Sequence, residues 1–237
     1  MSHKSYLVLI LPLIAGLLVA CGGGAAQPTA APTSAPAVPT ATAAGQSQST
    51  AVSSAGAIRF ELTGEDNEAR YRVREQLASL ALPSDAVGVT KAISGVLVLS
   101  ADGTTILSDE SKFVIDITGL QSDRSMRDRF VQNNVLDTNS YPTVELVPKQ
   151  IVGLEAPLTA SGEVTFQLIG DLTVHGVTRS TTWEVTGTAT EGRELTGTAK
   201  THFTFADFSL NQPRVPSVLS IQDNIQLEID FHFVRAE

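Results

Sequence analysis

The sequence predicts an all-β domain of antiparallel strands with one short helix. Three observations support this fold class. Apolar and polar residues alternate in several segments, which is the period of a strand with one buried face. A single segment has helical spacing, and no alternation of strands with long helices is present. A barrel and a sandwich both fit, and we prefer a single closed barrel because closure removes exposed strand edges.

The charge is distributed unevenly along the chain. The 237 residues contain 16 Lys and Arg against 25 Asp and Glu, a formal net charge of −9. Lys4 is the only one of these residues before Arg59. A nucleic-acid-binding protein would need a basic surface to neutralise phosphates, so we expect no nucleic-acid partner. The nearly uncharged first quarter is expected to lie outside the folded domain.

Residues 1–20 have the layout of a signal peptide. A weakly basic start precedes an apolar run from Tyr6 to Val19, which is shorter than the roughly 20 residues of a membrane-spanning helix. The string Leu18-Val19-Ala20-Cys21 resembles a bacterial lipobox, which implies cleavage before Cys21 and diacylglycerol attachment to its thiol. An ordinary signal peptide and an uncleaved anchor are the alternatives. We expect an extracytoplasmic lipoprotein, for example in a periplasm, with the membrane itself left open.

Residues 21–56 are predicted to be a linker. From Gly22 to Gly56 the chain is mostly Gly, Ala, Pro, Thr, Ser and Gln, without charge. Such a stretch cannot bury enough apolar surface to offset its chain entropy. It would hold the domain at residues 57–237 away from the membrane to which Cys21 is attached. A mucin-like, O-glycosylated stalk has the same composition.

The strands of the domain are expected where the alternation is clearest. In the first of them Tyr71 and Val73 share one face, and three arginines at positions 70, 72 and 74 face water on the other. Turns are expected at Asp102-Gly103, at His175-Gly176 and from Gly187 to Gly192, because Gly and Asp favour turns. The expected strands include residues 69–74, 93–99, 113–117, 164–168, 183–185, 199–205 and 225–233.

One helix and one irregular segment interrupt the strands. Ser122 to Phe130 begins with good N-cap residues and places Met126 and Phe130 four positions apart, which predicts a short helix. The helix should end before Asn133-Asn134, and Tyr141-Pro142 should resume extended chain. The segment 210–220, which contains two prolines, should join the last two long strands irregularly.

No motif predicts an enzyme. The sequence contains no nucleophile elbow, P-loop or His-Glu-x-x-His string. His202 and His232 occupy polar strand phases and could meet at a metal with Asp207 or Asp230, but no ligand spacing supports such a site. The acidic residues are scattered on polar phases, which is typical of a solvated surface. We expect no catalysis, no metal and no cofactor, and we interpret His175 as a residue that fixes its turn.

The string from Gly170 to Arg179, GDLTVHGVTR, is the most distinctive of the chain. Together with Arg127-Asp128, Leu136-Asp137 and Tyr141-Pro142 it closely resembles the YceI-like family of exported lipid-binding domains. The resemblance covers most of residues 59–233. It implies an eight-stranded, antiparallel, lipocalin-like barrel that holds one polyisoprenoid or similar long-chain amphiphile.

Two departures from a plain family member leave the ligand open: the lipobox with its linker, and a longer segment at residues 61–90. An eight-stranded barrel is either just filled or holds one small ligand. A structural or protein-interaction domain with a filled core is therefore the alternative function, and the oligomeric state is not predicted.

If the barrel binds an apolar chain, the contacts should come from the inward strand phases and from the helix. The same inward residues also fit an ordinary packed core. Met126 and Phe130 would line or cover the mouth, and Arg127 is the candidate for a phosphate headgroup, with Arg124 and Arg179 behind it. The candidate strand contacts are Tyr71, Phe113, Ile115, Phe166, Leu168, Trp183, Val185, Phe203, Ile229 and Phe231.

Overall fold

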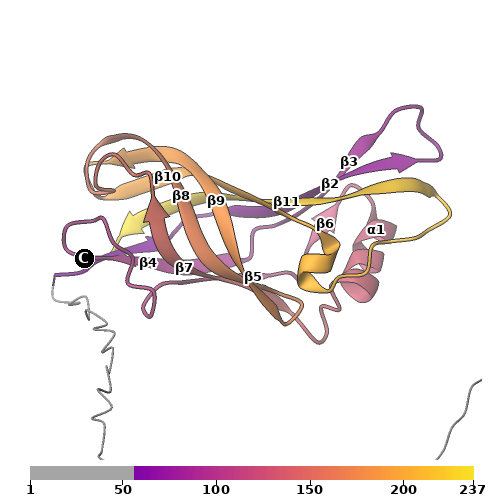
Figure 1. Ribbon diagram of the computed structural model, residues 1–237, viewed down its shortest axis with the longest axis horizontal. Helices are drawn as coiled ribbons and strands as arrows, with labels where there is room; N and C mark the ends of the chain where they lie inside the picture. Colours follow the sequence, from indigo (N-terminus) through magenta and orange to yellow (C-terminus); the bar gives the residue numbers. More distant parts are fainter. Residues whose placement is uncertain (1–55) are drawn as a thin grey trace, which may run out of the picture. The chain divides into compact units, whose positions relative to one another are not determined.

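The computed structural model describes residues 56–237, which form one antiparallel β-domain (Figure 1). The predicted signal peptide, the lipobox with Cys21 and all but the last residue of the linker lie outside the described residues. None of the helices in the described part is long and apolar enough to cross a membrane.

Eight strands close into an antiparallel barrel. Their order is β1-β4-β5-β7-β8-β9-β10-β11, and β1 pairs with both β4 and β11. The predicted all-β fold class is confirmed, and of the two predicted architectures the closed barrel is the one formed. The strands are β1 Ile58–Leu62, β2 Glu68–Leu77, β3 Ser84–Thr90, β4 Ile93–Leu99, β5 Lys112–Asp116, β6 Gln121–Ser122, β7 Thr143–Val152, β8 Gly162–Val174, β9 Val177–Thr190, β10 Glu194–Phe203 and β11 Val218–Arg235.

Strands β2, β3 and β6 extend the barrel strands β1, β4 and β5, respectively, and a short interruption separates the two members of each pair. The first part of β11 pairs with β2 and its end pairs with β1, so β1 and β2 are two pieces of one wall. Likewise β3 and β6 pair on the far side of β2, in line with β4 and β5. Buried Asn67 bridges the first interruption, because its amide donates to the Thr63 carbonyl at 2.8 Å and accepts from the His232 N–H at 2.7 Å.

The predicted helix is present, but its ends differ from the prediction. Helix α1 covers Ser125–Phe130 and continues as a π-helical turn, η1, over Val131–Val135. The helical segment was predicted to end before Asn133-Asn134, but it includes both residues. The Asn134 side-chain amide donates a hydrogen bond to the Phe130 carbonyl at 3.2 Å, so this residue supports the helix instead of ending it. Arg124 occupies the N-cap without a side-chain cap, and the predicted capping by Ser122 and Asp123 is wrong.

Two further local predictions are corrected. Phe205 is not part of the strand, because β10 ends at Phe203 and Thr204 caps the short 3-10 helix η2 (Phe205–Phe208). Thr204 Oγ1 accepts from the Asp207 N–H, and the Asp207 carboxylate accepts from the Thr204 N–H. Gly187 lies inside β9, and the turn is confined to Glu191-Gly192, where both residues have positive φ. Extended chain after Tyr141-Pro142 is confirmed by β7, and the His175-Gly176 turn is confirmed between β8 and β9.

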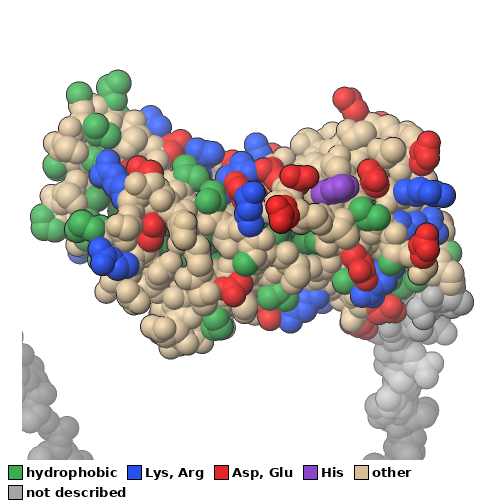
Figure 2. All heavy atoms as spheres, turned by 180° about the vertical axis from the view of Figure 1, so that it is seen from behind, with side chains coloured by type: hydrophobic (Ala, Val, Ile, Leu, Met, Phe, Trp, Pro, Cys, Tyr) green, Lys and Arg blue, Asp and Glu red, His purple; other side chains and the backbone are tan. Residues whose placement is uncertain are grey.

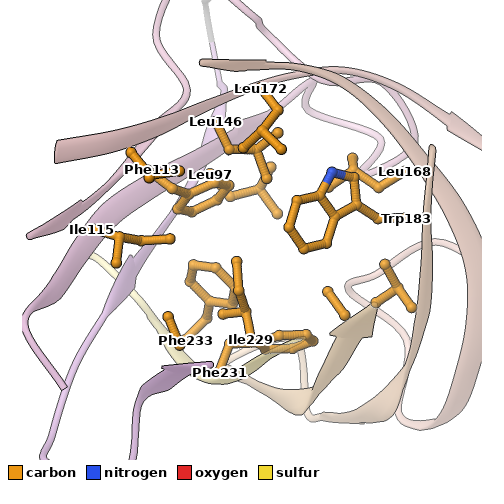
Figure 3. Packing of buried hydrophobic residues seen from close by; sticks show 14 of the residues in the cluster. Leu97, Phe113, Ile115, Leu146, Leu168, Leu172, Trp183, Ile229, Phe231 and Phe233 are labelled. Carbon is orange, nitrogen blue, oxygen red and sulfur yellow. The ribbon is translucent and has the colours of Figure 1, made fainter. Parts of the chain in front are cut away.

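One half of the barrel interior is packed with apolar side chains. Figure 3 shows Phe113 and Leu146 from one wall pointing toward Phe231 and Phe233 from the opposite wall. The ring centroids of Phe113 and Phe233 lie 5.6 Å apart, and those of Phe231 and Phe233 lie 5.3 Å apart. Aromatic pairs at such spacings add stability beyond the area that they bury. This packed half closes the end of the barrel at which β1, β4 and the C-terminal part of β11 lie.

Candidate functional site

The other half of the barrel contains a cavity of about 900 Å³. This volume lies near the upper end of the range of roughly 300–1,000 Å³ typical of small-molecule sites. Its walls are the β2, β3 and β11 side of the barrel, the α1–η1 segment and the irregular chain before β11. Most of its lining side chains are apolar, among them Val73, Leu77, Ala86, Val135, Val144, Leu210, Val215 and Ile225.

The cavity reaches the surface beside α1, where the lining residue Met126 is 77% exposed. Three further exposed apolar side chains belong to the chain segments that border this half of the barrel. They are Leu80 and Leu82 after β2, and Leu219 at the start of β11. Figure 2 shows hydrophobic side chains gathered at this end of the domain.

The structure brings eight of the thirteen predicted ligand contacts to this cavity. They come from five strands and helix α1, and for the five strand residues the alternation correctly placed the side chains inside the barrel. The eight are Tyr71, Ile115, Met126, Arg127, Phe130, Trp183, Phe203 and Ile229. Whether they touch a ligand stays a prediction.

The other five predicted contacts, Val185 among them, lie in the packed half. Phe113, Phe166, Leu168 and Phe231 are buried in the core and do not line the cavity. Alternation shows which face of a strand is inward, but it does not show how far along the barrel a residue lies. A ligand role for these side chains also stays a prediction.

Sequence reasoning missed two groups of lining residues. Val73 and Leu77 lie on the same inward face of β2 as Tyr71, and Leu77 lies beyond the predicted end of the strand. The segment before β11 contributes Pro213, Val215 and Pro216. The sequence did contain a signal for this second group, because an irregular segment with several apolar residues has to pack those residues against another part of the domain.

Trp183 lies at the inner end of the cavity and is fully buried. Its indole Nε1 donates a hydrogen bond to Thr181 Oγ1 at 2.9 Å, which satisfies the one polar group of the ring. Because the chain contains a single Trp and this residue lines the cavity, its fluorescence is a suitable probe for ligand binding.

A charged cluster lies among the apolar lining residues. Glu75 is only 6% exposed and its Oε1 accepts from Arg127 Nη2 at 2.5 Å. Arg127 also pairs with Asp123, four positions earlier. Burial raises the pKa of the nearby Tyr71 to about 12, although the positive charge of Arg127 opposes the shift. The Tyr71 phenol is therefore protonated at neutral pH and can donate a hydrogen bond.

Glu75 was not predicted as a site residue, although the sequence contains its signal. It follows Tyr71 and Val73 at a spacing of two and is therefore a carboxylate on the apolar phase of a strand. Such a residue needs a partner, because a buried charge without one is costly. Arg127 is that partner, and it comes from the helix rather than from the sheet.

Of the two remaining predicted cations, one lines the cavity and the other does not. Arg124 lines the cavity and its Nε lies 3.5 Å from Asp123 Oδ2. Arg179 does not line the cavity, because its Nε donates to the Asp207 carbonyl at 3.0 Å.

The arginine face of β2 is drier than predicted. Arg70 and Arg72 are half-buried, because both approach the buried carboxylate of Glu228 on β11. Arg74 is exposed and pairs with Asp85 at 2.9 Å. The prediction of a wet strand face is therefore right for Arg74 and wrong for the other two.

The histidines do not meet. On the paired strands His202 lies opposite Gln226, whereas His232 lies opposite Thr196, six positions away along β10. Within residues 56–237, no three His, Cys, Asp or Glu side chains are grouped so that they could hold a metal ion.

His175 lies in its turn beside Tyr141, and the backbone hydrogen bond by which it was expected to fix the turn stays a prediction. His175 has a φ of 50°, followed by 73° at Gly176, which is the positive-φ pair of a tight hairpin turn. Its ring centroid lies 4.5 Å from that of Tyr141. Since His175 is not among the residues that line the cavity, it is poorly placed to act on a ligand there.

Comparisons with known proteins agree with this architecture. Residues 60–233 match the family described as YceI-like domain. No curated protein matched the sequence. A polyisoprenoid binding domain from Saccharophagus degradans, implicated in plant cell wall breakdown, is 12% identical with a TM-score of 0.57, over 75% of this chain and 98% of that one.

Two further solved structures share the fold. Burkholderia cenocepacia BcnA is 17% identical with a TM-score of 0.51, over 74% of this chain and 99% of that one. The Campylobacter jejuni YceI protein is 17% identical with a TM-score of 0.52, over 68% and 91%. At these identities the likeness shows a common barrel, and the ligand has to be argued from the cavity of this chain.

Proposed function

The chain belongs to the YceI-like family, and from this premise we propose that it is a non-catalytic protein that binds a polyisoprenoid or a similar long-chain amphiphile. The observation that carries the proposal is the cavity of about 900 Å³ inside the barrel, lined mostly by apolar side chains. The name of the Saccharophagus degradans neighbour, a polyisoprenoid binding domain, supports the same ligand class.

The physical chemistry of the cavity suits an apolar chain. Removal of apolar surface from water stabilises a complex by about 25 cal/mol per Å², before the costs of ordering the ligand. A flexible prenyl chain can follow a cavity whose walls come from strands, helix and irregular segment together. The polar groups at Glu75, Arg127 and Tyr71 offer hydrogen bonds to one polar end.

The alternative function, a surface module with a filled core, is less well supported. Only one half of the barrel interior is packed in the way that such a module requires. Exposed Met126 at the rim of the cavity would have no structural purpose in a filled domain.

We further propose that the mature protein is anchored through a lipid on Cys21 and acts outside the cytoplasm. The support is the lipobox-like string that ends at Cys21 and the uncharged stretch that follows it. A lipid-anchored domain on a long linker would remain close to the membrane in which its ligand dissolves.

Organic extraction tests the ligand proposal. Protein purified from a host with membranes should release a long-chain lipid that mass spectrometry detects in near-stoichiometric amount. Added prenyl lipid should also change the fluorescence of Trp183 after delipidation. A lipid-free extract together with unchanged Trp183 emission would overturn the proposal.

A further inference from the structure

The charges inside the cavity form a closed set of ion pairs. Arg127 lies between Glu75, at 2.5 Å, and Asp123, so this group of three carries two negative charges and one positive charge. Arg124 lies close to the same Asp123. The third lining arginine, Arg70, pairs with carboxylates on β11.

A phosphate would meet an unfavourable environment here. To bind Arg127 it would have to compete with Glu75, which has few other ways to be neutralised because it is 6% exposed. Two anions would then share one cation in a cavity of low polarity, and like charges at close range repel strongly there. An uncharged hydroxyl can instead donate to Glu75 and accept from Arg127 while their ion pair stays intact.

Tyr71 adds a hydrogen-bonding group without adding charge. Its phenol is protonated at neutral pH, as an unperturbed tyrosine would be, and burial raises its pKa further, to about 12. It belongs to the same inward phase of β2 as Glu75 and lines the same cavity. The polar end of the cavity therefore offers donors and acceptors, and its arginines are already paired with carboxylates.

We propose that the cavity selects a long-chain lipid with an uncharged polar end, such as an alcohol, over the same chain ending in phosphate. Glu75 is the residue that sets this preference. The inference rests on the proposed function and sharpens it, and it replaces the phosphate-binding role predicted for Arg127 from the sequence.

Geranylgeraniol and geranylgeranyl monophosphate form a matched pair for the test. Their dissociation constants for the delipidated full chain are measured from the fluorescence of Trp183. The alcohol should bind at least about tenfold more tightly, as expected for one unfavourable charge contact at low polarity. Glu75→Gln should reduce that ratio by about tenfold, because it removes one of the two carboxylates that flank Arg127.

Two further variants keep the test decisive. Asp123→Asn removes the other partner of Arg127 from a side chain that is 69% exposed, so it should fold and should shift the ratio in the same direction. Glu61→Gln makes the same chemical change in an exposed pair with Arg59 at 2.8 Å, away from the cavity, and should leave the ratio unchanged.

The outcomes separate the two proposals. Tighter binding of the phosphate by the wild-type chain would overturn the inference and leave lipid binding in place. An unchanged ratio in both carboxylate variants would also overturn it. Failure of both lipids to bind the wild-type chain would overturn the inference and the proposed function together.

Discussion

Gly176 lies so close to Tyr141 that a β-carbon at position 176 would come within 2.6 Å of the Tyr141 Cε1 atom. Gly176 also has a φ of 73°, in the region that favours glycine. Two strings on which the family resemblance depends, Tyr141-Pro142 and His175-Gly176, thus contact each other in the fold. The distinctive turn is explained by packing and backbone geometry, without a catalytic role.

Gly176→Ala should lower the free energy of unfolding by about 2 kcal/mol or more, because it adds both a strained φ and a steric clash. Urea denaturation measures the change. Combining it with Tyr141→Ala should relieve the clash and leave the backbone strain, which gives a favourable coupling energy in a double-mutant cycle. Strictly additive effects would show that the contact with Tyr141 does not matter.

Tyr71 should make stability fall at alkaline pH. Its pKa is raised from 10.0 to about 12 in the folded domain, so the folded state retains a proton that the unfolded state releases. The contribution, on the order of 2–3 kcal/mol, is fully present below pH 10 and is lost as pH rises toward 12. Urea denaturation between pH 9 and 12 should show a shallower decline for Tyr71→Phe than for the wild type. Parallel curves would contradict the assignment.

Breaking the ion pair between Glu75 and Arg127 should lower the free energy of unfolding, whereas replacing both residues with apolar ones should lower it much less. Glu75→Ala leaves Arg127 in the cavity wall with only Asp123 and should destabilise the domain by about 2–4 kcal/mol. The double variant Glu75→Leu with Arg127→Leu should recover most of this loss, since both positions adjoin apolar side chains. Chemical denaturation provides the measurement, and Glu61→Gln should change stability by less than about 1 kcal/mol. A double variant as unstable as the two single losses added together would refute the expectation.

Filling the cavity should exclude the lipid. Ala86 lines the cavity on β3, opposite Val73, and Ala86→Phe places an aromatic ring in the open space. We expect a several-fold lower amount of lipid in organic extracts, with little loss of stability because the space already exists. Ala156→Phe, on an exposed loop, is the matched control and should carry the wild-type amount. Equal lipid content in Ala86→Phe and the control would place the ligand elsewhere.

Cys21→Ser should abolish lipid attachment and membrane association. Serine lacks the thiol to which the diacylglycerol would be joined, so the product should be uncleaved or soluble. Fractionation of cells and metabolic labelling with a fatty acid measure the two effects. Unchanged fractionation together with unchanged labelling would refute the lipobox prediction, which rests on the sequence.

The fold could be predicted well from the sequence because strand alternation is a local signal. Ile225 to Phe233 shows the inward phase of β11 directly, and closure follows from the need to cover strand edges. The end of α1 could not be predicted, because Asn134 supports the helix through its side chain instead of ending it. A residue type that usually ends a helix can lie inside one when its side chain hydrogen-bonds to a nearby backbone carbonyl.

The candidate site was only partly predictable for a geometric reason. Phe113 and Ile115 are two positions apart on the same face of β5, yet only Ile115 lines the cavity. Height along the barrel depends on register between strands, and register is set by pairings far apart in sequence. The pairing of Glu75 with Arg127 likewise joins a strand to a helix 52 residues away, and no local pattern in the sequence indicates it.

The interruptions that divide β1 from β2, β4 from β3 and β5 from β6 have a consequence for cooperativity. On the β1, β4 and β5 side of these interruptions the core is dense, whereas on the other side β6 contributes only two paired residues. Amide hydrogens near Phe166 and Val185 should exchange only by global unfolding, and those near Gly88 and Ser122 by cheaper local opening. The domain can thus loosen one end on a faster timescale while the other end keeps the chain folded, which would allow the proposed long-chain ligand to enter without global unfolding.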